Sequence, residues 1–478
     1  MNLVWFRHDL RIHDHLPLKN ALQSERETEA VYVLDSRNNE SVSPGLRRMG
    51  VKRFDFLAES LRDLEKSLEK LAVPLAVLAG TVTAELEDVI RENEVTDVYV
   101  HSHPGVEERK DLEELMQRFS EVRFHVSAGH TLLRRNQLPF DRSEFPMSFS
   151  RFRRELEKIL PIPTKASVFS PQEAALFQET VMAPAQGSHL NDNRSRIRPL
   201  TDLLAGYPNQ KTFVEGGETA GIRQLKAFVN DPERLFAYKE TRDGLLRFHD
   251  SSKLSFWLAN GSLSPKRVYQ EILQMEAERG RNESSYWLFF ELLWREYFQW
   301  LMWMTGSRLF QRRGFLPEDL PWHEDEHVFA KWAKGETGYP LVDAAMKELN
   351  ATGYMSNRAR QNAASFLTKN LGIDWRWGAR YFEEQLLDYD PASNYGNWAY
   401  QAGVGTDMRE LRAFNVIRQG ERYDPGGDYA KYWLELPEYI PGKDVYDPDK
   451  LKLYTSVPEP IVNFADSLEK RKKELGYS

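Results

Sequence analysis

The chain has 478 residues, a formal net charge of −8, 41% apolar and 28% charged residues, and no cysteine. This length exceeds one usual hydrophobic core and predicts two domains. The lack of cysteine excludes disulfides, thiolate catalysis and cysteine-bound metal clusters, and fits a reducing, cytoplasmic location. The negative charge argues against bulk attraction to nucleic acid, although phosphates would still feel a local basic groove.

Residues 1–130 predict an α/β domain. Short apolar runs rich in valine lie at 3–6, 30–35, 74–80, 95–102 and 122–129, and residues 51–71 carry leucines at helical spacing. Strands that alternate with helices indicate a doubly wound parallel sheet. The first strand is not followed by a G-x-G-x-x-G fingerprint, so the sequence gives no sign of a dinucleotide site there.

Residues 131–215 are rich in proline, serine and asparagine, and only 150–160 looks helical. We expect a long connector that lies over the surface. Residues 216–478 are helical in pattern and predict an all-α domain. The apolar stretch 286–304 contains too many polar residues for a membrane span and predicts a buried helix. We expect a capped helix at 251–261 that a serine opens and Gly261 ends, and another that starts at Ser264-Pro265.

The segment 353–407 combines many polar side chains with tryptophans. It contains Asn357, Arg358, Arg360, Asp388, Asp390 and Asn394, interspersed with Trp375, Trp377, Trp398 and Tyr400. So many charged groups and amides are rare in an aromatic core unless each has a partner. The segment therefore predicts a buried polar ligand. The alternative for 388–390 is two solvated acids at a helix end.

Four motifs of this segment resemble the photolyases and cryptochromes, and most closely the DASH-type cryptochromes. They are N-R-x-R-Q-N from 357, I-D-W-R from 373, D-x-D-x-x-S-N from 388 and G-N-W-x-Y from 396. The resemblance implies an all-helical domain that binds FAD and repairs cyclobutane pyrimidine dimers, mainly in single-stranded DNA, by light-driven electron transfer. The alternative is a blue-light photoreceptor that binds DNA with little or no repair.

By the same resemblance, FAD is held by residues of several segments. They are Tyr238, Ser251, Ser252, Lys253, Leu254, Ser255, Glu291, Arg295, Arg360, Asp388, Tyr389, Asp390 and Asn394. Arg360 is expected to pair with Asp388, and Asn394 to lie near flavin N5. From the residues alone, Ser251 and Ser252 are more often simple helix caps. Glu291 and Arg295, one turn apart, would form an ordinary helix salt bridge.

The resemblance also implies a lesion pocket and an electron relay. The lesion pocket comprises Glu291, Trp294, Asn357, Gln361 and Tyr400, and the relay comprises Trp398, Trp375 and Trp322. Gln361 and Tyr400 replace the methionine and tryptophan of ordinary class I photolyases, which is typical of DASH proteins. From spacing alone, tryptophans in a helical core are more often packing residues.

The N-terminal segment departs from the family pattern. It reads WFRHDLRIHDH, with His8 and His15 where the family usually has asparagine. Glu108 matches an acid that contacts 5,10-methenyltetrahydrofolate in relatives, so this folate is a candidate antenna, although a helix-surface charge is an equal alternative. For DNA, the candidate basic residues are Arg312, Arg313, Arg358, Arg376, Arg380, Arg409 and Arg412. We expect a monomer that does not bind membranes.

Overall fold

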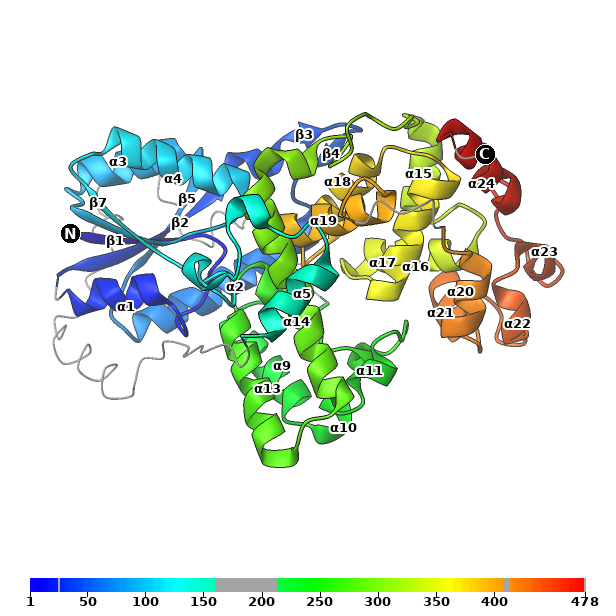
Figure 1. The fold of residues 1–478 in the computed structure, drawn as a ribbon, viewed down its shortest axis with the longest axis horizontal. Coiled ribbons are helices and arrows are strands. Elements are labelled where there is room, and N and C mark those ends of the chain that lie inside the picture. Colours follow the sequence, from blue (N-terminus) through cyan, green and yellow to red (C-terminus); the bar gives the residue numbers. More distant parts are fainter. Residues whose placement is uncertain (25, 160–212, 407–412, 477–478) are drawn as a thin grey trace.

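The computed structural model describes residues 1–24, 26–159, 213–406 and 413–476. Its N-terminal domain contains a five-stranded sheet in the order β5-β2-β1-β6-β7, and every neighbouring pair is parallel (Figure 1). The strands are β1 (Asn2–Phe6), β2 (Thr28–Asp35), β5 (Leu75–Gly80), β6 (Asp97–His101) and β7 (Arg123–Ser127). All five apolar runs predicted as strands are therefore strands.

Helices cover both faces of this sheet, which confirms the doubly wound prediction (Figure 1). On one face, α1 (Leu16–Gln23) and α2 (Val51–Glu69) enclose one apolar cluster. On the other face, α3 (Val82–Glu92) and α4 (Val106–Arg118) enclose a second cluster. A short antiparallel pair, β3 (Ser41–Val42) and β4 (Leu46–Arg47), follows η1 (Ser36–Asn39) and was not predicted.

The described start of the connector is packed into the helical domain. It contains η2 (Arg135–Gln137), η3 (Arg142–Glu144) and α5 (Phe149–Glu157). Phe145, Phe149 and Phe152 are buried in the same apolar cluster as the helical domain. The buried Glu296 carboxylate accepts from the backbone N–H groups of Leu132 and Leu133 at 2.8 and 3.1 Å. The expectation of a surface segment is therefore wrong for this part, and residues 160–212 lie outside the described residues.

Apart from one isolated bridge between His323 and Ile373, the regular structure in the described residues of the C-terminal domain is helical, and its helices share one large apolar cluster. Its first helices are α9 (Glu218–Val229), α10 (Pro232–Leu235), α11 (Tyr238–Thr241), η4 (Phe248–Asp250), α12 (Ser255–Ala259), α13 (Pro265–Arg279), α14 (Glu283–Thr305) and η5 (Gly306–Phe310). The middle helices are α15 (Glu326–Lys334), α16 (Pro340–Thr352), α17 (Asn357–Ser365), the π-helix η6 (Phe366–Asn370), α18 (Trp375–Gln385) and α19 (Pro391–Ala402). The last are α20 (Val416–Tyr423), α21 (Asp428–Leu434), α22 (Gly442–Val445), α23 (Pro448–Leu451) and α24 (Phe464–Glu474).

The longest helix, α14, passes through the middle of the molecule in Figure 1. Asn282 begins it, because its side chain accepts from the Ser285 N–H while the Ser285 hydroxyl accepts from the Asn282 N–H. Most of its residues are buried, as predicted for 286–304. In the described parts of the chain, no helix has the length and apolarity that a bilayer crossing requires.

The predicted helix at 251–261 begins later than expected. α12 starts at Ser255, and Ser251 and Ser252 lie in extended or irregular backbone before it. Lys253 has a φ of +57°, a left-handed conformation that a regular helix does not contain. The next helix, α13, begins as predicted, with the Ser264 hydroxyl accepting from the Lys266 N–H.

A candidate cofactor and substrate cavity in the helical domain

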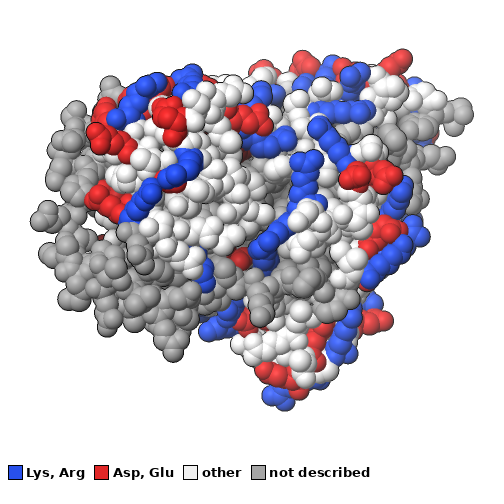
Figure 2. Space-filling model, turned by 60° about the vertical axis from the view of Figure 1, so that its left-hand side comes forward, with Lys and Arg blue, Asp and Glu red and all other residues white. Residues whose placement is uncertain are grey.

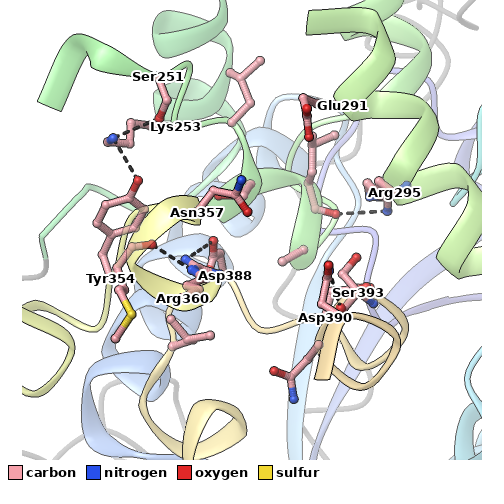
Figure 3. Close-up of a pocket in the computed structure, with 18 of the residues that line it drawn as sticks. Ser251, Lys253, Glu291, Arg295, Tyr354, Asn357, Arg360, Asp388, Asp390 and Ser393 are labelled. Atoms are coloured by element: carbon pink, nitrogen blue, oxygen red, sulfur yellow. Dashed lines mark hydrogen bonds and ion pairs between the residues drawn. The ribbon is translucent and has the colours of Figure 1, made fainter. Parts of the chain in front are cut away.

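A cavity of about 310 Å³ lies inside the helical domain, within the range of small-molecule sites. Its walls come mainly from α11, α12 and the segment before it, α14, α17 and one face of α19 (Figure 3). The structure brings sixteen of the predicted site residues to this one cavity. They are Tyr238, Ser251, Ser252, Lys253, Leu254, Ser255, Glu291, Arg295, Asn357, Arg360, Gln361, Asp388, Tyr389, Asp390, Asn394 and Trp398.

The ion pair expected between Arg360 and Asp388 lies in the wall of the cavity. Arg360 Nη2 donates to both Asp388 carboxylate oxygens at 2.9 and 3.0 Å, and Arg360 Nε donates to Met355 O at 2.7 Å (Figure 3). Asp388 is buried, so its charge requires this partner. Gly353, with a φ of +71°, ends α16 and turns the chain toward Met355.

Asp390 is a second buried carboxylate of the cavity. It caps α19 by accepting from the Ser393 N–H at 2.7 Å, and Gln299 Nε2 of α14 donates to both of its oxygens at 2.8 and 2.9 Å. Burial by itself would raise the pKa of Asp390, but His130 and the Arg295 guanidinium outweigh burial and hold this pKa below its usual value. The carboxylate is therefore ionised and fixed at physiological pH. The alternative of a solvated acid at a helix end is correct about the position of Asp390, which caps α19, but its side chain is buried and not solvated.

Lys253 is a buried cation without a carboxylate partner among the described residues. Its ammonium donates to Ser251 Oγ at 3.0 Å and to Tyr354 OH at 2.9 Å (Figure 3). It also lies 4.6 Å from the centre of the Tyr354 ring. The direct hydrogen-bond partners of this ammonium are neutral, and the carboxylates of Asp250 and Glu348 act on it only from further away. A buried ammonium so placed, on a left-handed backbone, is costly, so this arrangement favours an anionic group of a ligand.

The cavity mouth carries the carboxylate expected to contact substrate. Glu291 does not pair with Arg295; instead Arg242 forms an ion pair with it. Asn357, at the first position of α17, is exposed, and Gln361 is half-buried one turn later. Arg358 holds Gln361 by donating to its Oε1 at 2.9 Å, and donates to Asp243 Oδ2 at 2.8 Å. The mouth is thus polar and accessible, while the floor is polar and buried.

Two predicted substrate residues do not line this cavity. Trp294 stacks on Phe149 of α5, with ring centroids 3.7 Å apart, and it meets Tyr400 edge-on at 6.1 Å. Both side chains are half-buried. They form a second aromatic layer beside the cavity.

The three predicted relay tryptophans lie on connected segments. Trp398 lines the cavity, Trp375 is fully buried, and Trp322 lies beside the Trp375 segment through a bridge between His323 and Ile373. Trp375 Nε1 donates to Arg312 O at 2.9 Å, and Arg312 donates to Trp322 O at 3.3 Å. The close ring partners of Trp398 are Phe382 at 5.0 Å and Trp332 at 6.2 Å.

Several cavity residues were missed by sequence reasoning. They are Arg242, Tyr354, Met355, Ser393, Asn397 and Gln401. Helical spacing would have found the last two, because residues 394, 397, 398 and 401 share one face of α19. Arg242 and Tyr354 also lie close in sequence to predicted site residues, four residues after Tyr238 and three before Asn357, so spacing would have marked them as candidates.

A second cavity of about 520 Å³ lies between the two domains and contains Glu108. Its lining includes Trp5, Tyr32 and Arg48 from the N-terminal domain and Phe310 and Tyr395 from the helical domain. The predicted antenna residue therefore lies in a cavity of ligand size, separate from the sixteen residues of the first site apart from Tyr389, which lines both.

Comparison with known proteins agrees with this architecture. The family described as "FAD binding domain of DNA photolyase" matches residues 287–476, and the family described as "DNA photolyase" matches residues 2–171. A "Cryptochrome DASH" from Synechocystis sp. is 40% identical over 98% of this chain and 97% of its own length.

Two solved structures extend the likeness. The crystal structure of a Synechocystis cryptochrome superposes with a TM-score of 0.89 at 38% identity, covering 99% of this chain and 98% of the other. An archaeal photolyase from Sulfolobus tokodaii, solved with two FAD molecules, gives a TM-score of 0.80 at 27% identity over the whole of both chains. The chain belongs to the photolyase/cryptochrome family. Within that family its relatives place it with the DASH-type cryptochromes, and its cofactor is FAD.

The cavity residues fit FAD by their charges. Four cations (Arg242, Lys253, Arg295 and Arg360) face three carboxylates (Glu291, Asp388 and Asp390), which leaves one cation in excess. Lys253 is that cation, because Arg242 and Arg360 have carboxylate partners and Arg295 lies beside Asp390. A pyrophosphate would supply the missing anion.

Proposed function

We propose that the protein repairs cyclobutane pyrimidine dimers in blue light, mainly in single-stranded DNA. One observation carries this proposal: a single cavity joins a buried polar floor to an accessible polar mouth. The floor holds Asp388, Asp390 and Asn394, and the mouth carries Glu291 and Asn357. Such a cavity can enclose a flavin while a flipped-out pyrimidine dimer enters from outside.

The protein's own side chains bind FAD, orient the dimer beside it and polarise the dimer by hydrogen bonding. Lys253 and Ser251 offer a cation and a hydroxyl to phosphate, and the Arg360–Asp388 pair offers fixed donors and acceptors to the flavin ring. FAD, when bound, supplies light absorption and the electron for dimer cleavage. Glu291 and Asn357 are placed to hydrogen-bond the dimer, and Arg242 positions Glu291 before substrate arrives.

Asn394 and the three tryptophans have separate proposed roles. Asn394 Nδ2 donates to Ala379 O at 2.9 Å, so its carbonyl oxygen is left to face the ligand. Trp398, Trp375 and Trp322 are proposed to conduct electrons from the surface to the cavity. The contact of Trp398 with Trp332 offers a second route, which variants at 332 and 375 distinguish.

DNA is the proposed partner, and it would bind over the mouth of the first cavity. On the face drawn in Figure 2, a row of Lys and Arg side chains crosses the middle of the molecule. Of the predicted basic residues, Arg358 is at the mouth, whereas Arg312 and Arg376 both pair with the buried Asp374. Arg409 and Arg412 lie outside the described residues. The cytoplasmic location and the monomeric state stay predictions.

The preference for single strands follows from the cost of flipping. Base–aromatic stacking is worth about 1–3 kcal/mol per base, and unstacking a damaged step costs a similar amount. Tyr400 offers a smaller ring than tryptophan, and it packs edge-on against Trp294 outside the cavity lining. The pocket therefore offers little stacking to offset the opening of a closed duplex.

The test is dimer repair by the FAD-loaded protein under blue light. One dimer is placed in a single strand, in a looped duplex and in a closed duplex. We expect comparable repair of the first two and much weaker repair of the third. Equal repair of all three contradicts the strand preference. No repair of any substrate, with DNA binding retained, favours the photoreceptor alternative.

Matched variants separate chemistry from folding. Glu291→Gln removes the carboxylate charge at the mouth and is expected to lower repair at least tenfold without loss of FAD. Glu283→Gln, two turns earlier on α14, removes an exposed carboxylate that pairs with Lys239 away from the cavity. It is expected to repair like the unmodified protein. Equal repair by both variants would remove Glu291 from the mechanism.

The second cavity is proposed to hold a light-harvesting cofactor, with 5,10-methenyltetrahydrofolate as the candidate and Glu108 as a contact. Its size and its aromatic lining support this assignment. The relative solved with two FAD molecules supports a flavin as the other candidate. Extraction of chromophores from the purified protein decides between folate, a second FAD and neither.

A further inference from the structure

The outer end of the proposed tryptophan relay lies under the last helix, α24, which is at the end of the helical domain remote from the sheet (Figure 1). Trp322 is only 7% exposed. Arg471 of α24 reaches its ring, and the guanidinium carbon lies 4.8 Å from the ring centre. Arg471 is itself 2% exposed. The fold therefore fixes a cation against the outermost tryptophan of the relay.

The guanidinium of Arg471 is held in place by few other partners. Its Nη1 donates to the backbone carbonyl of Pro321 and to Glu474 Oε2, the latter at 3.0 Å. Its Nε and Nη2 are buried and have no hydrogen-bond acceptor among the described residues. A buried charge needs a partner, and the electron-rich face of an indole can supply part of it. Arg471 therefore depends on Trp322 for part of its stabilisation.

The carboxylate of Glu474 cancels only part of this positive charge. It is shared with two other groups, because its Oε1 lies 3.2 Å from His323 Nε2 and 3.9 Å from Lys470 Nζ. Arg312 donates to the backbone carbonyl of the same tryptophan, but it has carboxylate partners of its own at 3.3 Å. The charge that acts directly on the ring is thus that of Arg471.

The middle tryptophan of the relay has the opposite environment. Trp375 is fully buried, and its Nε1 donates to the carbonyl oxygen of Arg312 at 2.9 Å. Within the described residues, Trp322 is the one relay tryptophan that has a cation over its ring. A carbonyl oxygen at the indole N–H stabilises positive charge on the ring, whereas a nearby guanidinium opposes it. A missing electron is therefore favoured on Trp375 over Trp322.

We propose that Arg471 restrains the last step of the relay by making Trp322 harder to oxidise. This inference rests on the proposed relay, in which Trp398 gives one electron to light-excited FAD, Trp375 replaces that electron, and Trp322 replaces the electron of Trp375. Without an added reductant, the electron returns by the same steps, and no bond or proton is exchanged. Arg471 carries no electron and is a positioning residue that acts through its charge on Trp322.

The test is flash absorption of the FAD-loaded protein without reductant, which follows the tryptophan radical after a short light pulse. Arg471→Met removes the charge, so the missing electron should settle on Trp322, farther from the cavity, and the radical should live about tenfold longer. Arg471→Lys keeps a positive charge and should resemble the unmodified protein. Glu474→Gln removes the carboxylate that offsets Arg471 and should shorten the lifetime about twofold.

The opposite signs of these effects separate charge from packing, since a loosened helix would change both variants in the same direction. Lys472→Met and Glu469→Gln make the same chemical changes at exposed positions of α24, where the two side chains pair with each other at 2.7 Å. Both should leave the lifetime unchanged. If Arg471→Met does not fold, Glu474→Gln decides by itself, because it keeps the guanidinium in place.

Two further measurements place the effect at Trp322. Adding Trp322→Phe to Arg471→Met should abolish the longer lifetime. In denaturant unfolding in the dark, the destabilisations by these two changes should not add, because both remove the same contact.

Trp375→Phe tests the relay itself, and an unchanged lifetime in that variant would overturn both the relay and the inference. If Trp375→Phe does shorten the lifetime, the inference alone is overturned by either of two results. One is that Arg471→Met and Glu474→Gln behave like the unmodified protein. The other is that the longer lifetime of Arg471→Met survives the addition of Trp322→Phe.

Discussion

Glu348, on α16 behind the first cavity, gives the sharpest test of the buried electrostatics. It is buried, its Oε2 accepts from Tyr429 OH at 2.7 Å, and Lys253 and Arg360 lie near enough to act on its charge. Burial raises the pKa of Glu348 from 4.5 to about 7, against the opposing effects of Tyr429 and these two cations. The perturbation is Glu348→Gln, which keeps an oxygen that accepts from Tyr429 OH and replaces the titrating carboxyl group by a neutral amide.

The sign of the effect follows from proton uptake. Below pH 4.5 the folded and unfolded states both hold the proton, and between pH 4.5 and 7 only the folded state does. Stability of the unmodified protein therefore falls as the pH rises through this interval. A shift of this size corresponds to about 3 kcal/mol of destabilisation at pH 8. The variant avoids this cost, so it should be more stable at pH 8 and equal at pH 4.5.

The assay is denaturant unfolding of the FAD-loaded protein at the two pH values, followed by tryptophan fluorescence. Asp343, whose pKa burial raises to about 6, contributes equally to both proteins and cancels in the comparison. Glu318→Gln, at an exposed position, is the matched control and should show no pH-dependent gain. A variant no more stable than the unmodified protein at pH 8 would refute the reasoning.

Three further predictions concern the cofactor site. Trp398→Phe should slow photoreduction of FAD at least tenfold with normal flavin content, since the volume change is small; unchanged photoreduction would exclude Trp398 as the first donor. Asn394→Asp places a carboxylate where the amide faces the ligand, so FAD should be reduced at lower potential in a spectroelectrochemical titration; an unchanged potential would argue that Asn394 does not contact the ring. A fragment of residues 216–478 should fail to bind FAD, because it lacks the buried Phe149 and Phe152, whereas residues 131–478 should bind it. Yellow, folded 216–478 would show that α5 is dispensable.

Most of the architecture was predictable because its signals are local. Strands inside a parallel sheet are buried on both faces and form apolar runs, and all five predicted runs contain strands, although the edge strand β7 is partly exposed and carries Arg123 and His125. The start of α12 was misplaced because the left-handed backbone at Lys253 is imposed by its surroundings. The connector was misjudged for a similar reason: α5 is short and charged, yet its phenylalanines pack into a core formed far away in sequence.

The residues of the cavity were predictable as a set, and so was the Arg360–Asp388 ion pair, but other pairings were not. Sixteen predicted side chains do line one cavity, because the resemblance to the photolyases and cryptochromes covers whole motifs rather than single positions. The residues alone offered Arg295, one turn away, as a salt-bridge partner for Glu291, but Glu291 pairs with Arg242, 49 residues away. The contact of Trp398 with Trp332 likewise joins α19 to α15. Such pairings depend on how the helices cross in space, and the periodicity of the sequence carries no information about helix crossing.

The paired arginines at the cavity mouth have a consequence for how binding responds to salt. Arg242 is held by Glu291, and Arg358 is held by Asp243 while it stacks on Tyr423, 4.4 Å from the ring centre. A DNA phosphate that meets either guanidinium also meets its carboxylate, which cancels part of the positive charge. Fewer counterions then leave the DNA for each arginine contacted. The affinity for DNA should therefore decline only gently with ionic strength, so that contacts to the bases carry a larger share of recognition.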